Sequence, residues 1–299
     1  MKKVSEFFRT KLNMTDVTLG EIYHAFGVLK TNAIGLHGLN ARGLYPLIAL
    51  MSHSCVSNLD PMIQMGNNFG FKAQRKIPEG EELTIRYLQV LEHRLFLRCQ
   101  FSENWMFECG CRRCRDPSEL GSFLSSPRCT ECSGFLVPLR PLQIESDWKC
   151  NLCDSSLPAS AIRDLENAAR TLVGAVDLKS FGAISELVGQ FEKKYHPNYV
   201  QIVHLKLTYN ALELESANFS NEEESEIHKL KIRYCTDVLG VLDKIDPGIT
   251  KLRKQTYSTL AKGRLFIVQE KKKNATVTKD DFLKEMKICL ALQKLALQQ

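Results

Sequence analysis

Cysteines are the residues whose spacing in this sequence points most directly to chemistry. The chain contains 11 of them, and seven lie between positions 109 and 153. Two Cys-x-x-Cys pairs, Cys129 with Cys132 and Cys150 with Cys153, are separated by 17 residues. Each pair places two thiolates on one turn, and two such pairs complete a tetrahedral zinc site with no open position for water or substrate. The spacing therefore predicts a structural zinc site, because chance rarely produces two such pairs among ordinary buried cysteines.

A second cysteine group lies upstream of these pairs. Cys109, Cys111 and Cys114 supply three thiolates, which leaves a tetrahedral zinc ion one ligand short. The fourth ligand must come from elsewhere in the chain, and Cys55 is the best candidate because it lies in the polar segment 52–58. We therefore predict two structural Zn2+ ions held by eight cysteines. The other cysteines fall in predicted helices and are interpreted as buried thiols. They are Cys99, Cys235 and Cys289.

The elements that must position these cysteines differ between the two halves of the chain, with a change near residue 155. In the first half, Phe69–Arg75 and Leu83–Tyr87 alternate apolar and polar residues, which is the pattern of strands. They lie on either side of the turn sequence Pro78–Gly80, so we expect them to form a hairpin-like pair. Residues 90–107 have the apolar spacing of a helix.

From about residue 159 onward the sequence has the pattern of long amphipathic helices. Short breaks between them imply antiparallel neighbours, as in a bundle or a helical-repeat array. No clean repeat of about 34 residues is present, so a repeat name is an analogy. The run Lys271–Lys273 is expected to end a helix and is weak evidence for nuclear import. The predicted helices span 160–176, 182–194, 198–217, 222–244, 250–270 and 279–297.

Composition limits the class of protein. With 299 residues, 44% hydrophobic and 25% charged, the chain is an ordinary globular sequence long enough for two domains. Its apolar runs are too short to span a membrane, and its first residues lack the apolar core of a signal peptide. The net charge of +6 is too small to indicate direct nucleic-acid binding. A zinc-ribbon DNA-binding protein is also disfavoured, because no basic helix accompanies the segment 129–153.

Three segments resemble, in order and spacing, the motifs of SET-domain lysine methyltransferases. The segment Gly43–Asn58 is similar to the family pattern NHSCxPN, Ile77–Tyr87 to its GEEL-x-x-x-Y segment, and Phe107–Cys114 to its post-SET zinc motif. The helical half resembles the SMYD branch, in which a helical domain follows the SET domain. The extra cysteine pairs in 129–153 resemble those of arthropod members. The resemblance covers nearly the whole chain.

This resemblance implies an α+β fold, in which a partial SET β-fold with a post-SET zinc site precedes an all-α helical (TPR-like) domain. The expected divisions are 1–107 for the partial SET domain, 108–155 for the post-SET and zinc region, and 156–299 for the helical domain. Family members begin with SET strands that carry a Gly-x-Gly loop for S-adenosylmethionine and are interrupted by a MYND zinc finger. Residues 1–40 resemble instead the insertion within the SET domain, so we expect a family member truncated at its N-terminus.

The resemblance also implies an activity, the transfer of a methyl group from S-adenosyl-L-methionine to a protein lysine. Tyr87 is the implied catalytic tyrosine, which orients the amine; an isolated strand tyrosine would be structural, but the motif Gly80–Leu83 before it favours the catalytic role. His53 would contact the adenine mainly through its backbone. Phe107 would pack on the adenine, with a plain core phenylalanine as a close alternative. The implied cofactor-binding residues are Asn32, Ser52, His53 and Phe107.

Two residues depart from the family pattern. The family asparagine before His53 is Ser52, which has fewer donors for the methionine end of the cofactor, and the proline before Asn58 is Ser57, which is expected to loosen the turn. Ser52, together with the expected N-terminal truncation, favours an alternative, a catalytically weak or inactive zinc-stabilised adaptor that binds other proteins in transcriptional repression. The expected partners are protein substrates, histone or non-histone, and proteins docked on the helical domain. No membrane partner is expected, and the expected location is the cytoplasm and the nucleus.

Overall fold

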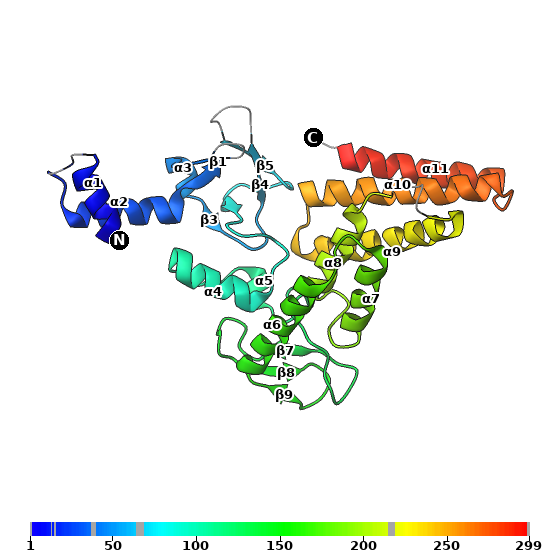
Figure 1. Cartoon of the computed structure of the whole chain (residues 1–299), viewed down its shortest axis with the longest axis horizontal. Helices are drawn as coiled ribbons and strands as arrows, with labels where there is room; N and C mark the ends of the chain where they lie inside the picture. Colours follow the sequence, from blue (N-terminus) through cyan, green and yellow to red (C-terminus); the bar gives the residue numbers. More distant parts are fainter. Residues whose placement is uncertain are drawn as a thin grey trace.

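The structure is a computed structural model that describes residues 2–12, 14, 16–36, 40–63, 69–214 and 219–297. Figure 1 shows a part with short strands, drawn in blue and cyan, beside a part built from long helices, drawn in green to red. The chain therefore has the predicted mixed architecture, with strands in its first half and an all-helical C-terminal region. None of the described helices is long and apolar enough to cross a membrane.

The N-terminal half is built from short strands that pair in twos. β1 pairs with β2 and β4 with β5, both antiparallel, whereas β3 and β6 run parallel. Helix α2 starts at a capping box, in which the Thr18 hydroxyl accepts the Glu21 N–H and the Glu21 carboxylate accepts the Thr18 N–H. The elements are α1 (Lys2–Thr10), α2 (Leu19–Asn32), β1 (Ile34–Leu36), β2 (Ala41–Gly43), α3 (Pro46–Ala49), β3 (Ser52–His53), β4 (Leu59–Ile63), β5 (Phe69–Ala73) and β6 (Thr84–Ile85).

The expected hairpin between Phe69–Arg75 and Leu83–Tyr87 is wrong. Both segments contain strands, β5 and β6, and the turn at Pro78–Gly80 is present, with Gly80 at a φ of 82°. However, β5 pairs with β4, and β6 pairs with β3. The reason is competition for hydrogen bonds: β4 offers β5 a five-residue antiparallel ladder, while the segment after β3 holds the backbone around β6.

Helix α4 (Arg94–Trp105) lies within the predicted range 90–107 and is shorter at both ends. It begins at His93, whose ring nitrogen accepts the Leu95 N–H at 3.3 Å. It ends at Met106, which adopts the left-handed conformation with a φ of 57°. This cap turns the chain back, so that Phe107 returns to the helix and its ring lies 5.2 Å from the ring of Phe101.

The region after α4 is a short helix followed by a small sheet. Helix α5 (Arg112–Arg115) is followed by β7 (Leu136–Pro138), β8 (Trp148–Cys150) and β9 (Ser156–Leu157). These strands form an antiparallel sheet in the order β7-β8-β9, seen at the bottom of Figure 1. Trp148 is almost fully buried and packs with Cys129, Cys150 and Ile162. The sheet thus joins the cysteine-rich segment to the first helix of the helical region.

The helical region follows the predicted pattern, and the boundaries shift by a few residues. The largest difference is in α8, which ends at Ala211 although the sequence predicts a helix to 217; residues 215–218 lie outside the described part. Helix α9 begins at the capping box of Ser220 and Glu223. The helices are α6 (Ala159–Ala175), α7 (Phe181–Glu192), α8 (Val200–Ala211), α9 (Asn221–Ile245), α10 (Lys251–Lys273) and α11 (Lys279–Leu297).

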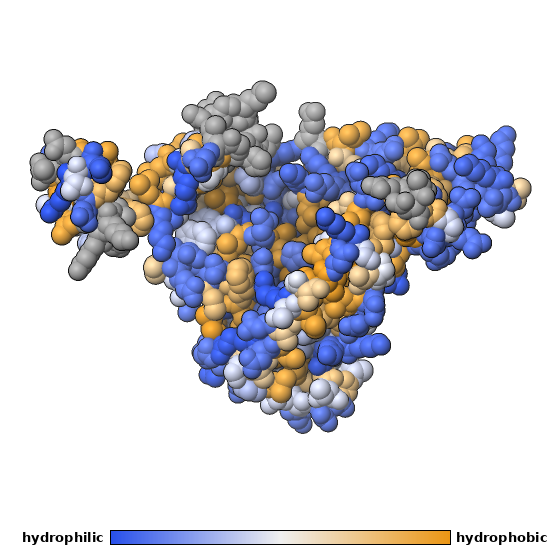
Figure 2. Space-filling model, in the orientation of Figure 1, coloured by the Kyte–Doolittle hydropathy of each residue, from blue (hydrophilic) through white to orange (hydrophobic). Residues whose placement is uncertain are grey.

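From α7 onward the helices pack in sequence order, α6 contacts α8, and residues of α6 to α9 share one core. α7 contacts α8, α8 contacts α9, α9 contacts α10, and α10 contacts α11. The core includes Tyr199, Val238 and Leu242, each almost completely buried. Helix α10 ends at the lysine run 271–273, as predicted, and Figure 2 shows hydrophilic residues covering that outer end of α10 and α11. The three-way division of the chain stays a prediction.

Candidate active site and metal centres

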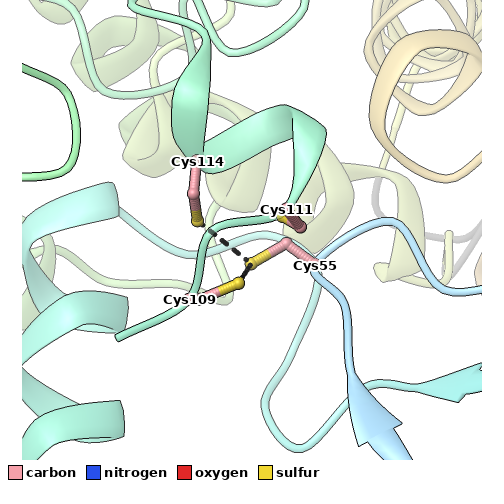
Figure 3. A group of neighbouring side chains, drawn as sticks. All are labelled: Cys55, Cys109, Cys111 and Cys114. Carbon is pink, nitrogen blue, oxygen red and sulfur yellow. Dashed lines mark hydrogen bonds between the residues drawn. The ribbon is translucent and has the colours of Figure 1, made fainter. Parts of the chain in front are cut away.

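Four cysteines from two distant segments meet beside the parallel strand pair (Figure 3). Cys55 follows β3, whereas Cys109, Cys111 and Cys114 come from the loop into α5 and its first turn. The Cys55 sulfur lies 3.9 Å from that of Cys109 and 3.6 Å from that of Cys114, and all four sulfurs lie within 4.8 Å of one another. A zinc ion with bonds of about 2.3 Å to four thiolates needs sulfur–sulfur distances of about 3.8 Å. This group, the first cysteine cluster, fits such an ion.

The second cysteine cluster contains the two predicted Cys-x-x-Cys pairs. The Cys132 sulfur lies 3.5 Å from the sulfurs of both Cys150 and Cys153, and the Cys129 sulfur lies 3.7 Å from that of Cys153. All four sulfurs again lie within 4.8 Å of one another. The spacing fits a tetrahedral zinc ion with four protein ligands and no open position.

Backbone amides in the second cluster point at the sulfur atoms. The Glu131 N–H donates to Cys129 at 3.4 Å and lowers the pKa of that thiol to about 6. The Gly134 N–H donates to Cys132 at 3.3 Å. A Cβ atom at position 134 would lie 2.5 Å from the Cys150 sulfur, so only glycine fits there. These features favour thiolates, the form in which cysteine binds a metal.

Asn58 holds the segment after β3 against the segment before and within β6. Its amide nitrogen donates to the Glu82 carbonyl at 2.8 Å and to the Glu81 carboxylate at 2.9 Å. Its amide oxygen accepts the Thr84 N–H at 2.9 Å. The buried Ser57 hydroxyl donates to the Leu59 carbonyl at 3.1 Å, and the looser turn expected at this position stays a prediction. The two family-like segments are therefore tied together beside the first cysteine cluster.

Tyr87 follows β6 and is held at both ends. Its hydroxyl donates to the Met51 carbonyl at 2.7 Å, and its backbone N–H donates to His53 Nδ1 at 3.1 Å. Burial raises the pKa of the Tyr87 phenol, so the hydroxyl keeps its proton at neutral pH. The Trp105 ring lies 5.5 Å from the Tyr87 ring, and the Trp105 indole N–H donates to the Thr31 carbonyl at 3.0 Å.

Two cavities meet at Tyr87. The larger cavity, of ≈ 770 Å³, is lined by all four residues expected to bind the cofactor, Asn32, Ser52, His53 and Phe107. The smaller cavity, of ≈ 320 Å³, is lined mainly by apolar residues of β1, α3, β4, β5 and β6. Both volumes are in the usual range of small-molecule sites, about 300–1,000 Å³. The residues that line both cavities are Thr31, Asn32, Tyr87 and Trp105.

The sequence-predicted residues differ in how firmly they are held. The Asn32 amide donates to the Val28 carbonyl and the Thr31 hydroxyl, so it is anchored at the end of α2. Ser52 is exposed at the mouth of the larger cavity. Phe107 packs against Phe101 and is half-buried. These three residues therefore line the larger cavity from different parts of the chain.

Sequence reasoning missed the part played by Trp105 and the side chain of His53. Trp105 closes the boundary between the two cavities, and the only signal in the sequence was its position two residues before Phe107. The His53 ring does not simply line the cavity: Nδ1 accepts the Tyr87 N–H, and Nε2 lies 3.4 Å from the Cys55 sulfur. The contacts of Trp105 with Thr31 and of His53 with Tyr87 join residues 74 and 34 positions apart, so no local pattern could reveal them, whereas Cys55 lies only two residues from His53.

Buried charges lie next to the first cysteine cluster. Arg113 and Glu119 are almost fully buried and form an ion pair at 2.9 Å, and Arg94 lies 3.9 Å from the same carboxylate. Burial by itself would lower the pKa of Arg113, but the charges of Glu119 and Cys55 outweigh it and raise the pKa. Two guanidinium groups against one carboxylate leave positive charge beside the sulfurs, which favours thiolates there.

Comparison with known proteins finds a SET domain in the N-terminal part of the chain. A family model of the SET domain matches residues 18–88. The SET domain-containing protein SmydA-8, isoform A, of Drosophila melanogaster is 27% identical over 264 residues, which cover 84% of this chain and 56% of the fly protein. The histone-lysine N-methyltransferase SMYD3 of Homo sapiens is 42% identical over 73 residues, 24% of this chain and 17% of the human protein.

A plant relative matches over a similar range. The histone-lysine N-methyltransferase ASHR1 of Arabidopsis thaliana is 23% identical over 272 residues, which cover 84% of this chain and 54% of the plant protein. The chain thus spans about half the length of the curated relatives it matches along most of its sequence.

Proposed function

Because this chain is a SET-domain protein of the SMYD type, we propose that the whole protein transfers methyl groups from S-adenosyl-L-methionine to lysine side chains of other proteins. The observation that carries the proposal is the position of Tyr87, whose side chain forms part of the wall between two cavities. Methyl transfer is a direct displacement that needs the amine in line with the methyl group, and the family resemblance implies that the two reactants enter from opposite faces of the site. The larger cavity would take the cofactor and the smaller one the lysine side chain.

The residues of the larger cavity fit the chemical parts of the cofactor. When bound, S-adenosyl-L-methionine supplies an electrophilic methyl group on a sulfonium sulfur. Phe107 offers an aromatic face for the adenine, Asn32 and Ser52 offer polar groups, and the backbone of His53 lies at the same wall. The rings of Phe101 and Phe107 restrict water on that side.

Tyr87 acts by orientation and not as a base. The phenol keeps its proton because burial raises its pKa, so its O–H can donate to the Met51 carbonyl while its oxygen accepts a hydrogen bond from the substrate amine. The lysine amine must enter as the neutral form to have a free electron pair. The mainly apolar lining of the smaller cavity favours this neutral form, because desolvation lowers the pKa of a lysine.

Zinc has a structural role in this proposal. In the first cysteine cluster it would join the segment carrying His53 to the loop that follows Phe107, and hence two walls of the larger cavity. In the second cluster it would stabilise the sheet β7-β8-β9, away from the cavities. Neither ion would touch a reacting atom, because four thiolates fill its coordination sphere.

The proposal is tested with the whole protein and a lysine-containing substrate pool. We expect calorimetric binding of S-adenosyl-L-methionine and transfer of its labelled methyl group to lysine. Tyr87→Phe should reduce transfer about 100-fold or more while cofactor binding persists. The control is Tyr257→Phe on α10, where the hydroxyl accepts a bond from Arg253, and transfer should stay unchanged. Normal transfer by Tyr87→Phe, or no cofactor binding, would contradict the proposal.

A second candidate function is that of a catalytically weak or inactive adaptor that binds other proteins in gene repression. It is supported by Ser52, whose short side chain stands exposed where the family resemblance expects an asparagine. The variant Ser52→Asn separates the two candidates. If cofactor affinity and methyl transfer both rise in this variant, the protein is a weak enzyme. If neither cofactor binding nor methyl transfer is detected in either chain, the adaptor is favoured.

A further inference from the structure

We propose that His53 is a positioning residue that connects the first cysteine cluster to the backbone of Tyr87 through a single ring tautomer. Its ring lies between the two groups: Nδ1 is 3.1 Å from the Tyr87 backbone nitrogen, and Nε2 is 3.4 Å from the Cys55 sulfur. The proposal rests on the proposed function only where it treats Tyr87 as the catalytic residue.

The tautomer follows from the donor at Tyr87. A backbone N–H can only donate, so the nitrogen that faces it, Nδ1, must carry a lone pair. In a neutral imidazole the proton then resides on Nε2, which faces Cys55. The Nε2–H therefore donates to the sulfur, and a thiolate is the stronger acceptor for that bond. Both ring nitrogens are used, each by a different part of the site.

The ring has little freedom to turn away from this bridge. The Phe101 ring, completely buried, lies 4.4 Å from the His53 ring, and the rings of Tyr87 and Phe107 lie at 5.2 and 6.0 Å. The backbone is also held, because His53 pairs with Ile85 in the parallel ladder and the Ser54 N–H donates to the Ile85 carbonyl at 3.1 Å. Rotating the ring would leave the Tyr87 N–H without its acceptor.

The bridge gives the zinc ion a defined influence on Tyr87. When the cluster holds an ion, Cys55 is a thiolate and the Nε2–H bond selects the tautomer that Tyr87 needs. The Tyr87 hydroxyl is held by its hydrogen bond to the Met51 carbonyl. The hydrogen bond from the Tyr87 backbone N–H to His53 fixes the position of the backbone of the same residue. A packing histidine, by contrast, would need only its shape and not a particular tautomer.

The experiment uses the whole protein with 113Cd2+ in place of zinc, read by NMR. We expect two cadmium resonances, of which the one lost in Cys55→Ser shows a scalar coupling to the His53 Nε2 proton. The 15N shifts of the ring should show a protonated Nε2 and an unprotonated Nδ1. A ring protonated at Nδ1, or a cluster signal without that coupling, would overturn the proposal.

Two substitutions separate the ends of the bridge. In His53→Asn the side-chain oxygen can replace Nδ1 but no donor reaches Cys55, so we expect a shifted cadmium resonance, faster metal loss to a chelator and a nearly unchanged Tyr87 amide signal. In His53→Gln the amide nitrogen can replace Nε2, and the pattern should reverse. The control is His228→Asn in α9, whose ring stacks on Phe266 far from the cluster in sequence.

Equal effects of the two substitutions on both signals would reduce His53 to a packing residue and contradict the proposal. If a variant fails to fold, the ring tautomer and the cadmium coupling measured on the unmodified protein still test the proposal. The outcome is independent of activity, because normal methyl transfer by Tyr87→Phe would end the proposed function and leave the bridge measurable.

Discussion

Arg86 and Asp246 form an ion pair across 160 positions of the chain. Arg86 directly precedes Tyr87, and Asp246 caps the C-terminus of α9, so the pair joins the strand part to the helical region. Asp246 is only 1% exposed; its Oδ1 accepts from Arg86, and its buried Oδ2 has no hydrogen-bond partner. Arg86 also lies 3.6 Å from Asp60, where burial raises the pKa of the carboxyl group. The helical region is thus held against the residue next to Tyr87.

The first prediction concerns this ion pair. Arg86→Met should lower the free energy of unfolding by about 3 kcal/mol, because it leaves the Asp246 carboxylate buried without its partner. Asp246→Asn should recover part of that loss in the same chain, which a double-mutant cycle from urea unfolding would measure. The control is Arg75→Met, whose ion pair with Glu81 is much more exposed and should matter less. Independent, additive effects at positions 86 and 246 would refute the coupling.

The second prediction concerns Asn58. Asn58→Ala should lower the free energy of unfolding by about 2–3 kcal/mol, because the Thr84 N–H and the Glu82 carbonyl lose their partner in a buried place. Chemical unfolding measures the change. Asn104→Ala is the matched control, since its amide donates only to the Gln100 side chain on the same helix. A loss at Asn58 no larger than at Asn104 would show that this residue does not hold the two segments together.

The third prediction concerns metal content. Native mass spectrometry should find two zinc ions per chain, one for each cysteine cluster. Cys55→Ser and Cys129→Ser should each remove one ion, and only the first should disturb the Tyr87 amide signal, because only Cys55 contacts His53. Cys235→Ser, at a buried thiol in α9, should keep both ions. Zero or one ion in the unmodified chain would break the assignment.

The fourth prediction concerns pH. Burial lowers the pKa of His196 to about 4, below its ordinary value of 6.5, so the folded protein binds this proton less readily than the unfolded chain. The stability contributed by His196 is complete above pH 6.5 and is lost as the pH falls from 6.5 to 4. His196→Asn keeps an acceptor for the Asn198 N–H but cannot titrate.

Urea unfolding at pH 7 and pH 5 measures this effect. The unmodified protein should lose more stability between the two values than His196→Asn does, and acid-induced loss of zinc affects both chains alike. Equal losses would place the pKa of His196 near its ordinary value in the folded state and refute the prediction.

Patterns within short stretches of sequence were enough to predict several parts of the fold. The helices after residue 159 follow from apolar periodicity, and the start of α9 from the sequence of Ser220 and the acidic residues after it. The grouping of eight cysteines into two sets follows from their spacing and from the position of Cys55. These features depend on residues close together in the chain or on the ligand number of one ion.

The pairing of the strands could not be predicted in this way. Alternation identifies β5 and β6 as strands but does not name their partners, and the expected pairing of these two with each other is wrong, because β5 pairs with β4 and β6 with β3. The partners are decided by the hydrogen bonds of Asn58 and by the five-residue ladder between β4 and β5. The roles of the four residues expected to bind the cofactor, Asn32, Ser52, His53 and Phe107, likewise stay predictions until binding is measured.

The sequence by itself predicted most of the helices after residue 159, the two cysteine groups and the order of the SET-like motifs, because each depends mainly on local spacing and residue chemistry. The tertiary structure alone decided that Trp105 and Tyr87 separate two cavities, that His53 points one nitrogen at Tyr87 and the other at Cys55, and that Asp246 reaches Arg86. The physical reason is that a buried donor or acceptor must find a partner wherever the folded chain provides one, and that partner need not be near in sequence.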